Sequence, residues 1–453
     1  MSASYPAATA ASLASDLRAG RRDPLDLVEE CFARVAAVGD DAIFTETTRP
    51  RAEAEARAAR ERLRAGNPAS LLDGVPIAWK DLFDLKGRTT TAASAVMRGR
   101  APAARDAALV HAAMRAGMVT VGCVNMTEFA FSGIGINPHF GTPRNPNDAG
   151  VHRSPGGSSS GSGVVVAQGI VPISIGTDTG GSIRIPSAFN GVVGYKTSTG
   201  HFPMEGVFPL SPTLDTLGPL ARSVEDCVLA DAVLRGLPAP AAVAADPAAL
   251  RFVVPDRVMF DDLDPAVAAN FAATVDRLTA AGARVTRIAL PQLTEVGEVI
   301  ARHGILASIE AMAVHRDRMA GPEKAQIDPR VVKRIMMGAE VKAIDLIALT
   351  ENRRRLIAEV NAAIGDAFLI CPTTPTTAMP IGPLEADQEV FFRHNTRTLR
   401  NTALGNFLDW CGLSIPNGTD AAGMPTGFLI SAPHGRDRAL LSAGLGLETI
   451  IRG

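Results

Sequence analysis

Lysine and runs of positive charge are scarce in this sequence. The 453 residues carry a net charge of −2, and only six of the 45 basic residues are lysines. Without a basic tract, nucleic acid and an anionic membrane are excluded as expected partners. Because a buried lysine can lose its proton whereas an arginine stays charged, each lysine is a candidate for a chemical role.

Cysteine pairs and long apolar segments are lacking as well. The five cysteines are scattered and form no C-x-x-C, which excludes a disulfide framework and a zinc knuckle. The most apolar segment, residues 163–176, is interrupted by Gly169 and Pro172 and is too short to span a bilayer. The N-terminus has no basic stretch followed by an apolar one, so no signal peptide is expected. These features predict a reduced, cytoplasmic protein.

From about residue 72, short apolar runs alternate with helical patterns. Expected strands cover residues 75–79, 118–124, 171–176, 251–254, 284–290, 368–371 and 426–430, and helical patterns lie between several of them, for example at 106–116 and 158–168. Such alternation predicts the α/β class, with a mixed central β-sheet covered by helices on both faces.

Two stretches rich in glycine and serine, residues 154–163 and 176–186, lie on either side of an expected buried strand. A flexible linker is disfavoured for the first, because an apolar helix and a strand follow it at once. A phosphate loop would end in Gly-Lys-Ser or Gly-Lys-Thr, which is absent. Residues 157–161 match G-x-S-x-G, which would make Ser159 a nucleophile, but turn formers rather than a strand precede them.

The second stretch favours a different nucleophile, Ser182. Two glycines precede it directly after a buried strand, so the N–H groups of residues 179–182 can converge on an anion such as a tetrahedral acyl intermediate. No pairing singles out one of the eight histidines as its base. Lys80, at the end of the strand 75–79, could accept the proton through a second serine. A salt bridge from Lys80 to Asp81 or Asp84 stays open as the alternative.

Three segments resemble the amidase signature family, whose members use a Ser–cis-Ser–Lys triad. They are Gly-Val-Pro-Ile-Ala-Trp-Lys-Asp at 74–81, Pro-Gly-Gly-Ser-Ser-Ser-Gly-Ser at 155–162 and Gly-Thr-Asp-Thr-Gly-Gly-Ser-Ile-Arg at 176–184. The resemblance implies Lys80 as the base, Ser158 as the cis-serine and Ser182 as the nucleophile. It also implies oxyanion donors at Thr179, Gly180, Gly181 and Ser182, and substrate contacts at Ala130 and Phe131. Two departures stand out, Ser160 in place of a glycine and Trp79 in place of a small aliphatic residue. Together, Trp79 and Phe131 predict an apolar or aromatic acyl group.

The implied activity is hydrolysis of a small-molecule amide, with neither a metal nor an organic cofactor. A homodimer is a habit of the family. The implied organisation is an N-terminal helical segment at 1–70 that packs on a catalytic domain at 71–453, within which 250–360 is a variable helical region. Two alternatives remain: the glutaminase (A) subunit of a tRNA-dependent amidotransferase, and a non-catalytic scaffold.

Overall fold

The computed structural model describes residues 8–147 and 150–453, and within these ranges eleven strands form one continuous sheet. Their spatial order is β1-β3-β2-β4-β6-β5-β10-β11-β9-β7-β8. The strands are β1 (Phe44–Thr47), β2 (Pro76–Lys80), β3 (Val119–Val124), β4 (Ile173–Asp178), β5 (Val193–Lys196), β6 (Thr216–Ala221), β7 (Arg251–Pro255), β8 (Arg284–Ile288), β9 (Phe368–Pro372), β10 (Trp410–Thr419) and β11 (Pro425–Pro433).

The sheet is mixed, as predicted. Strand β2 runs parallel to both of its neighbours, β3 and β4, and β7 runs parallel to β8 and β9. The central strands β6, β5, β10 and β11 pair in antiparallel fashion. Parallel strands end at the same edge of a sheet, so the carboxyl ends of β2 and β4 lie side by side.

Both faces of the sheet are buried. In β2, Ile77 and Trp79 belong to the largest hydrophobic cluster, whereas Ala78 packs in a separate cluster with residues 164–166. Successive side chains of a strand point to opposite faces, so helices must cover both sides of β2. This arrangement confirms the predicted α/β class with helices on both faces.

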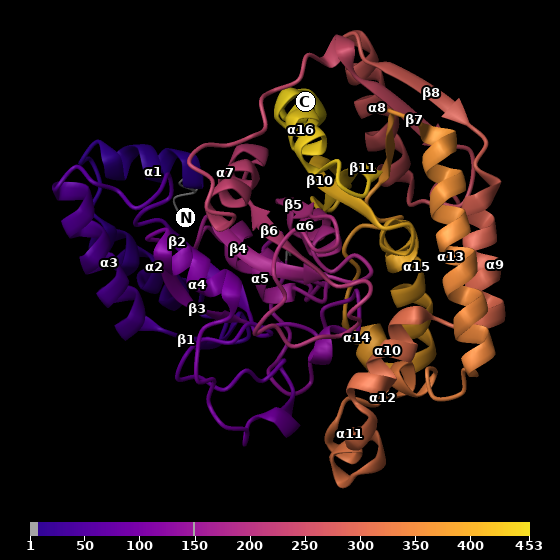
Figure 1. Ribbon diagram of the computed structural model, residues 1–453, viewed down its shortest axis with the longest axis horizontal. Coiled ribbons are helices and arrows are strands. Elements are labelled where there is room, and N and C mark those ends of the chain that lie inside the picture. Colours follow the sequence, from indigo (N-terminus) through magenta and orange to yellow (C-terminus); the bar gives the residue numbers. More distant parts are fainter. Residues whose placement is uncertain (1–7, 148–149) are drawn as a thin grey trace.

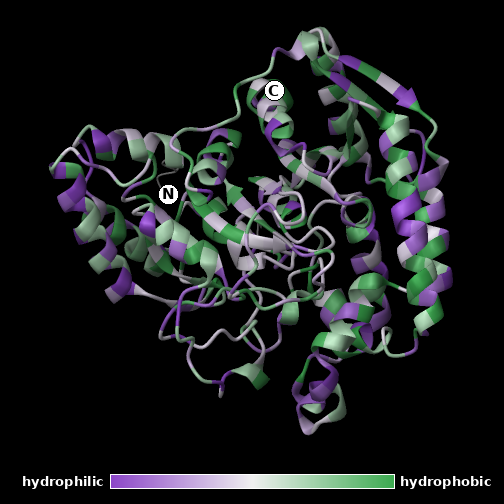
Figure 2. Ribbon diagram, in the orientation of Figure 1, coloured by the Kyte–Doolittle hydropathy of each residue, from purple (hydrophilic) through white to green (hydrophobic). Residues whose placement is uncertain are grey.

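The helices at the two ends of the sheet lie far apart in the molecule. Figure 1 shows α1–α3 at one side and the packed pair α9 and α13 at the other. Hydrophilic residues recur along the outer helices α3 and α13 in Figure 2. The α-helices are α1 (Ala10–Arg18), α2 (Pro24–Val38), α3 (Arg49–Arg64), α4 (Ala108–Arg115), α5 (Ser160–Ala167), α6 (Arg184–Asn190), α7 (Val224–Leu234), α8 (Pro265–Ala280), α9 (Pro291–His303), α10 (Leu306–Val314), α11 (Arg316–Ala320), α12 (Pro329–Met336), α13 (Ala343–Ile364), α14 (Gly382–Ala386), α15 (Gln388–Phe407) and α16 (Asp437–Arg452).

The first 70 residues contribute a strand as well as helices. Strand β1 pairs with β3 in antiparallel fashion, with Phe44 opposite Val124. Its four residues show no apolar alternation, and it forms because the edge of β3 offers backbone partners. Residues 250–360 likewise continue the sheet, through β7 and β8, beside α8–α13. In the part of the chain described, no helix has an apolar stretch long enough to cross a bilayer.

Candidate active site

Lys80 and Thr177 meet where the parallel strands β2 and β4 end. Lys80 is the last residue of β2 and is fully buried, and its Nζ atom lies 2.7 Å from the Oγ1 atom of Thr177. The strand end therefore holds the lysine inside the protein rather than in water. The alternative was a salt bridge from Lys80 to Asp81 or Asp84. Among the described residues, neither carboxylate forms a salt bridge with Lys80.

Ser158 is the second contact of Lys80. The Nζ atom of Lys80 lies 2.7 Å from the Oγ atom of Ser158, and both side chains are completely buried. The peptide bond between Gly157 and Ser158 is cis, as the resemblance implies. A side chain at Gly157 would lie only 2.7 Å from the backbone nitrogen of Gly135, so glycine is needed for this close approach.

Burial changes the protonation of Lys80. Desolvation lowers its pKa from 10.5 to about 7, although the negative charges of Asp215 and Asp178 act in the opposite direction. Burial penalises the charged ammonium, and here this effect outweighs the two carboxylates. A substantial fraction of Lys80 is consequently neutral at neutral pH and able to accept a proton.

Ser182 lies in the turn that connects β4 with α6. The Asp178 carboxylate organises this turn by accepting hydrogen bonds from the N–H of Gly181 (2.8 Å) and of Ile183 (3.1 Å). The carbonyl of Ser182 accepts a hydrogen bond from the N–H of Ser159 (3.3 Å), the residue next to Ser158. The turn and the start of α5 are thus joined through their backbones, which brings Ser158 and Ser182 into one site.

A buried ion pair between Arg184 and Asp178 supports the turn that carries Ser182. Arg184 donates from Nη2 to Oδ1 of Asp178 (2.9 Å) and from Nε to Oδ2 (3.0 Å), and both side chains are at most 1% exposed. Burial alone would raise the pKa of Asp178, but the charge and hydrogen bonds of Arg184 hold it well below its usual range. The carboxylate therefore stays ionised and keeps accepting the N–H groups of the turn.

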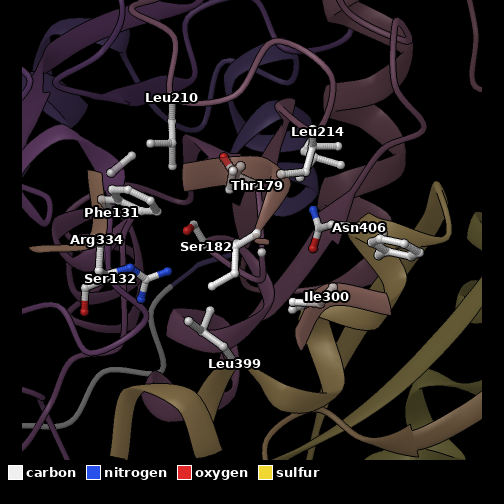
Figure 3. A pocket seen from close by; sticks show the side chains of 17 residues that line it. Phe131, Ser132, Thr179, Ser182, Leu210, Leu214, Ile300, Arg334, Leu399 and Asn406 are labelled. Atoms are coloured by element: carbon white, nitrogen blue, oxygen red, sulfur yellow. The ribbon is translucent and has the colours of Figure 1, made fainter. Parts of the chain in front are cut away.

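Ser182 opens into a pocket with a volume of about 110 Å³. Figure 3 shows its hydroxyl at the centre of the pocket, with Phe131 on one side and Leu214 and Asn406 on another. Most of the wall is apolar. The lining residues are Ala130, Phe131, Ser132, Thr179, Gly180, Ser182, Leu210, Leu214, Ile300, Ile305, Leu306, Ala307, Arg334, Leu399, Ala403, Asn406 and Phe407.

The residues expected at this site divide into two groups. Ala130, Phe131, Thr179 and Gly180 all line the pocket with Ser182. Gly181, expected as a further anion donor, does not line it, and its N–H donates to Asp178 instead.

Trp79 also lies away from the pocket. It is fully buried and packs against Phe83, with ring centroids 5.3 Å apart. Its side chain packs in the largest hydrophobic cluster, so Trp79 does not contribute to the acyl pocket as the sequence predicts.

Sequence reasoning did not single out Thr177, Asp178, Arg184 or Arg334. The first three lie within or beside the glycine-rich motif, and their position next to Ser182 was the available signal. No signal in the sequence pointed to Arg334. It lies about 150 residues after Ser182, on α12, whose sequence pattern is that of an ordinary amphipathic helix. Among residues 8–147 and 150–453, no group of three or more His, Cys, Asp and Glu side chains could hold a metal ion.

Comparisons with known proteins show which family the chain resembles. The profile of the family described as Amidase matches residues 26–441. The chain is 36% identical over 410 residues to 2-amino-5-chloromuconic acid deaminase of Comamonas testosteroni, and the match covers 88% of this chain and 87% of that protein. It is 34% identical over 484 residues to the A subunit of the glutamyl-tRNA(Gln) amidotransferase of Acidothermus cellulolyticus, covering 98% and 94%. A crystal structure of an amidase superposes with a TM-score of 0.87 at 32% identity, covering 98% of this chain and all of that one.

Proposed function

We propose that this chain, which belongs to the amidase family and is an amide hydrolase, cleaves a small-molecule carboxylic amide through an acyl-enzyme on Ser182. The observation that carries the proposal is the contact between Lys80 and Ser158, 2.7 Å long, beside a pocket that Ser182 lines. A serine hydroxyl is a weak nucleophile unless a base removes its proton. The buried lysine, with a pKa of about 7, supplies that base.

The proton moves through Ser158 in both halves of the reaction. As Ser182 attacks the amide carbon, its proton passes to Ser158, and Ser158 gives its own to neutral Lys80. The relay then returns a proton to the leaving nitrogen as the C–N bond breaks, which releases ammonia or an amine. Water attacks the resulting ester by the same route, and the acid leaves.

Backbone N–H groups of the turn stabilise the tetrahedral intermediate. No backbone or side-chain acceptor in the described ranges bonds the N–H of Gly180 or of Ser182, and both residues line the pocket. We assign these two, with Thr179, to the oxyanion. Gly181 has a different part, because its bond to Asp178 orients the turn. Preorganised donors of this kind contribute a large share of catalysis in acyl transfer.

The test is ammonia release from a panel of primary amides, measured for the wild type and Ser182→Ala in parallel. The panel contains short aliphatic amides, monoamides of dicarboxylic acids, aryl amides, indole-acetamide and glutamine. We expect turnover of at least one class and its complete loss in the variant. Full turnover by Ser182→Ala would disprove the acyl-enzyme.

Labelling with a fluorophosphonate tests Ser182 without a substrate. We expect one adduct on Ser182 in the wild type, and none in Ser182→Ala or Lys80→Met. If the wild type does not react, the chain is a non-catalytic scaffold.

The glutaminase (A) subunit of a tRNA-dependent amidotransferase remains the second candidate. It is favoured by the 34% identity to such a protein over 98% of this chain. That function requires glutamine as the amide and a partner protein that receives ammonia. Glutamine hydrolysis alone among the panel, together with a stable partner recovered on purification, would establish it in place of the small-molecule amidase.

A further inference from the structure

Three of the five polar side chains that line the pocket are hydrogen-bonded within the protein. Ser132 donates to Asn395 (3.0 Å), and Thr179 donates to Asp215 (2.5 Å). Asn406 donates to Asp178 (2.9 Å) and accepts from Arg184. These three side chains already have hydrogen-bond partners within the protein. Two lining side chains have polar atoms with no hydrogen-bond partner in the described part of the chain, the hydroxyl of Ser182 and the guanidinium of Arg334.

Arg334 enters the pocket from α12, a helix that carries none of the site residues predicted from the sequence. Its guanidinium carbon lies 4.5 Å from the centre of the Phe131 ring. In Figure 3 the guanidinium extends into the pocket beside Phe131, on the side of Ser182. One face of the cation therefore rests on an aromatic ring, while its N–H donors remain free for a ligand.

The other basic residues of α12 differ from Arg334 in this respect. Arg330 pairs with Asp328 at 2.7 Å, and Lys333 is exposed over the ring of Phe392. No carboxylate of residues 8–147 or 150–453 forms a salt bridge with Arg334 or shifts its pKa. Burial alone lowers that pKa to about 10, which leaves the guanidinium charged at neutral pH. A partly buried cation without a counter-ion is costly unless a ligand supplies the negative charge.

A buried contact fixes the start of α12 against the loop that carries Phe131. The N–H of Asp328 donates to Oε2 of Glu128 (2.7 Å), and Glu128 is fully buried. Glu128 is three residues before Phe131, so the ring and the guanidinium are held by connected parts of the structure. Arg334 is thus part of a prearranged wall and not a freely moving surface side chain.

We propose that Arg334 binds a carboxylate of the substrate, so that the amide cleaved at Ser182 is the monoamide of a short dicarboxylic acid. The inference rests on the proposed function, because it assumes that the amide carbonyl lies at Ser182. The planar fork of a guanidinium matches the two oxygens of a carboxylate. The side chains of Leu210 and Leu399 line the same pocket and offer only apolar contact, which suits a short hydrocarbon chain.

The experiment compares amides that differ only at the far end of the acyl chain. Succinic, glutaric and adipic monoamides are each matched with the alkanamide that carries an isopropyl group in place of the carboxylate. Binding is measured by titration calorimetry on the inactive Ser182→Ala protein, and kcat/KM by ammonia release from the wild type. We expect the best monoamide to bind about 100-fold more tightly than its isopropyl match.

Arg334→Met removes the charge and keeps the length of the side chain. We expect it to weaken binding of the monoamide about 100-fold and to leave or improve that of the isopropyl match. Lys333→Met removes a positive charge from the same helix, outside the pocket, and should change neither. Arg334→Lys should restore part of the lost affinity. The thermal midpoint of each variant shows whether it is folded.

The failure of this proposal differs from a failure of the proposed function. If a fluorophosphonate labels Ser182 but no monoamide binds better than its match, the carboxylate site is disproved and the hydrolase stands. If Arg334→Met weakens binding of the monoamide and of its isopropyl match by the same factor, the charge of Arg334 does not contribute to binding. Arg334 would then have a packing role alone. If Ser182 is not labelled, the hydrolase itself fails, and calorimetry still decides whether Arg334 binds a carboxylate.

Discussion

The Nζ atom of Lys80 and the Oγ atom of Ser158 lie 2.7 Å apart, although the two residues are 78 positions apart in the sequence. Both side chains are completely buried, so no water competes for the contact. The proton relay proposed for Ser182 depends on this pair. Changes to the residues around Lys80 and Ser182 should therefore alter activity or stability.

The activity should depend on the protonation of Lys80. Its pKa is lowered to about 7 by burial, so below that pH the amine carries a proton and cannot accept another. We expect kcat/KM to fall about tenfold for each pH unit below 7 and to level off above it. The measurement is a pH–rate profile between about pH 5 and 9 with a neutral amide. A flat profile would exclude a neutral-lysine base.

Thr177 should tune the same proton transfer, because its Oγ1 atom is the other polar contact of Lys80. We expect Thr177→Val to lower kcat about tenfold and to move the acidic limb of the profile. Ser174→Ala is the control, since it removes another buried hydroxyl of β4, bonded to the carbonyl of Ala78. Both variants should lose about 1 kcal/mol of stability. A shifted limb in the control would show that the effect is not specific to Lys80.

The two glycines before Ser182 should differ in their tolerance of alanine. Gly181 has φ +135°, and an added Cβ would overlap the hydroxyl of Thr402, whereas at Gly180 the nearest atom would be 3.6 Å away on Leu399. We expect Gly181→Ala to destabilise the protein by about 2 kcal/mol. We expect it also to lower kcat/KM about 100-fold, because Ser182 is displaced.

Thermal unfolding of both variants checks the difference between these glycines. Gly180→Ala should retain the wild-type midpoint, whatever its effect on substrate binding in the pocket. Equal midpoints for the two variants would contradict the conformational requirement at Gly181.

Loss of the ion pair beneath the Ser182 turn should be costly. Asp178→Asn leaves the guanidinium of Arg184 buried without a counter-ion, and we expect a loss of about 3 kcal/mol. The exposed pair between Arg22 and Glu30 is the comparison, and Glu30→Gln should cost less than about 1 kcal/mol. Denaturant unfolding measures both. A similar small cost in the two variants would show that Asp178 does not support the turn.

Much of the fold could be predicted because its elements are strongly patterned. Strands β2, β3 and β4 were expected within two residues of their observed bounds, since each is a buried apolar run followed by a turn. Strands β1, β5, β6 and β10 were not expected. Strand β5 has only four residues, and Trp410–Thr419 contains two glycines and a proline, so both depend on pairing with neighbouring strands.

The sequence by itself predicted the type of chemistry, because a glycine pair before Ser182 and a rare lysine at a strand end are local features, and the resemblance of these segments to the amidase signature family added Ser158. Only the tertiary structure decided which groups these residues meet. It placed Thr177 on Lys80, turned the N–H of Gly181 toward Asp178 and removed Trp79 from the pocket. It also brought Arg334 over Phe131 from about 200 residues away. Such contacts depend on strand order and helix packing, which no local pattern of residues encodes.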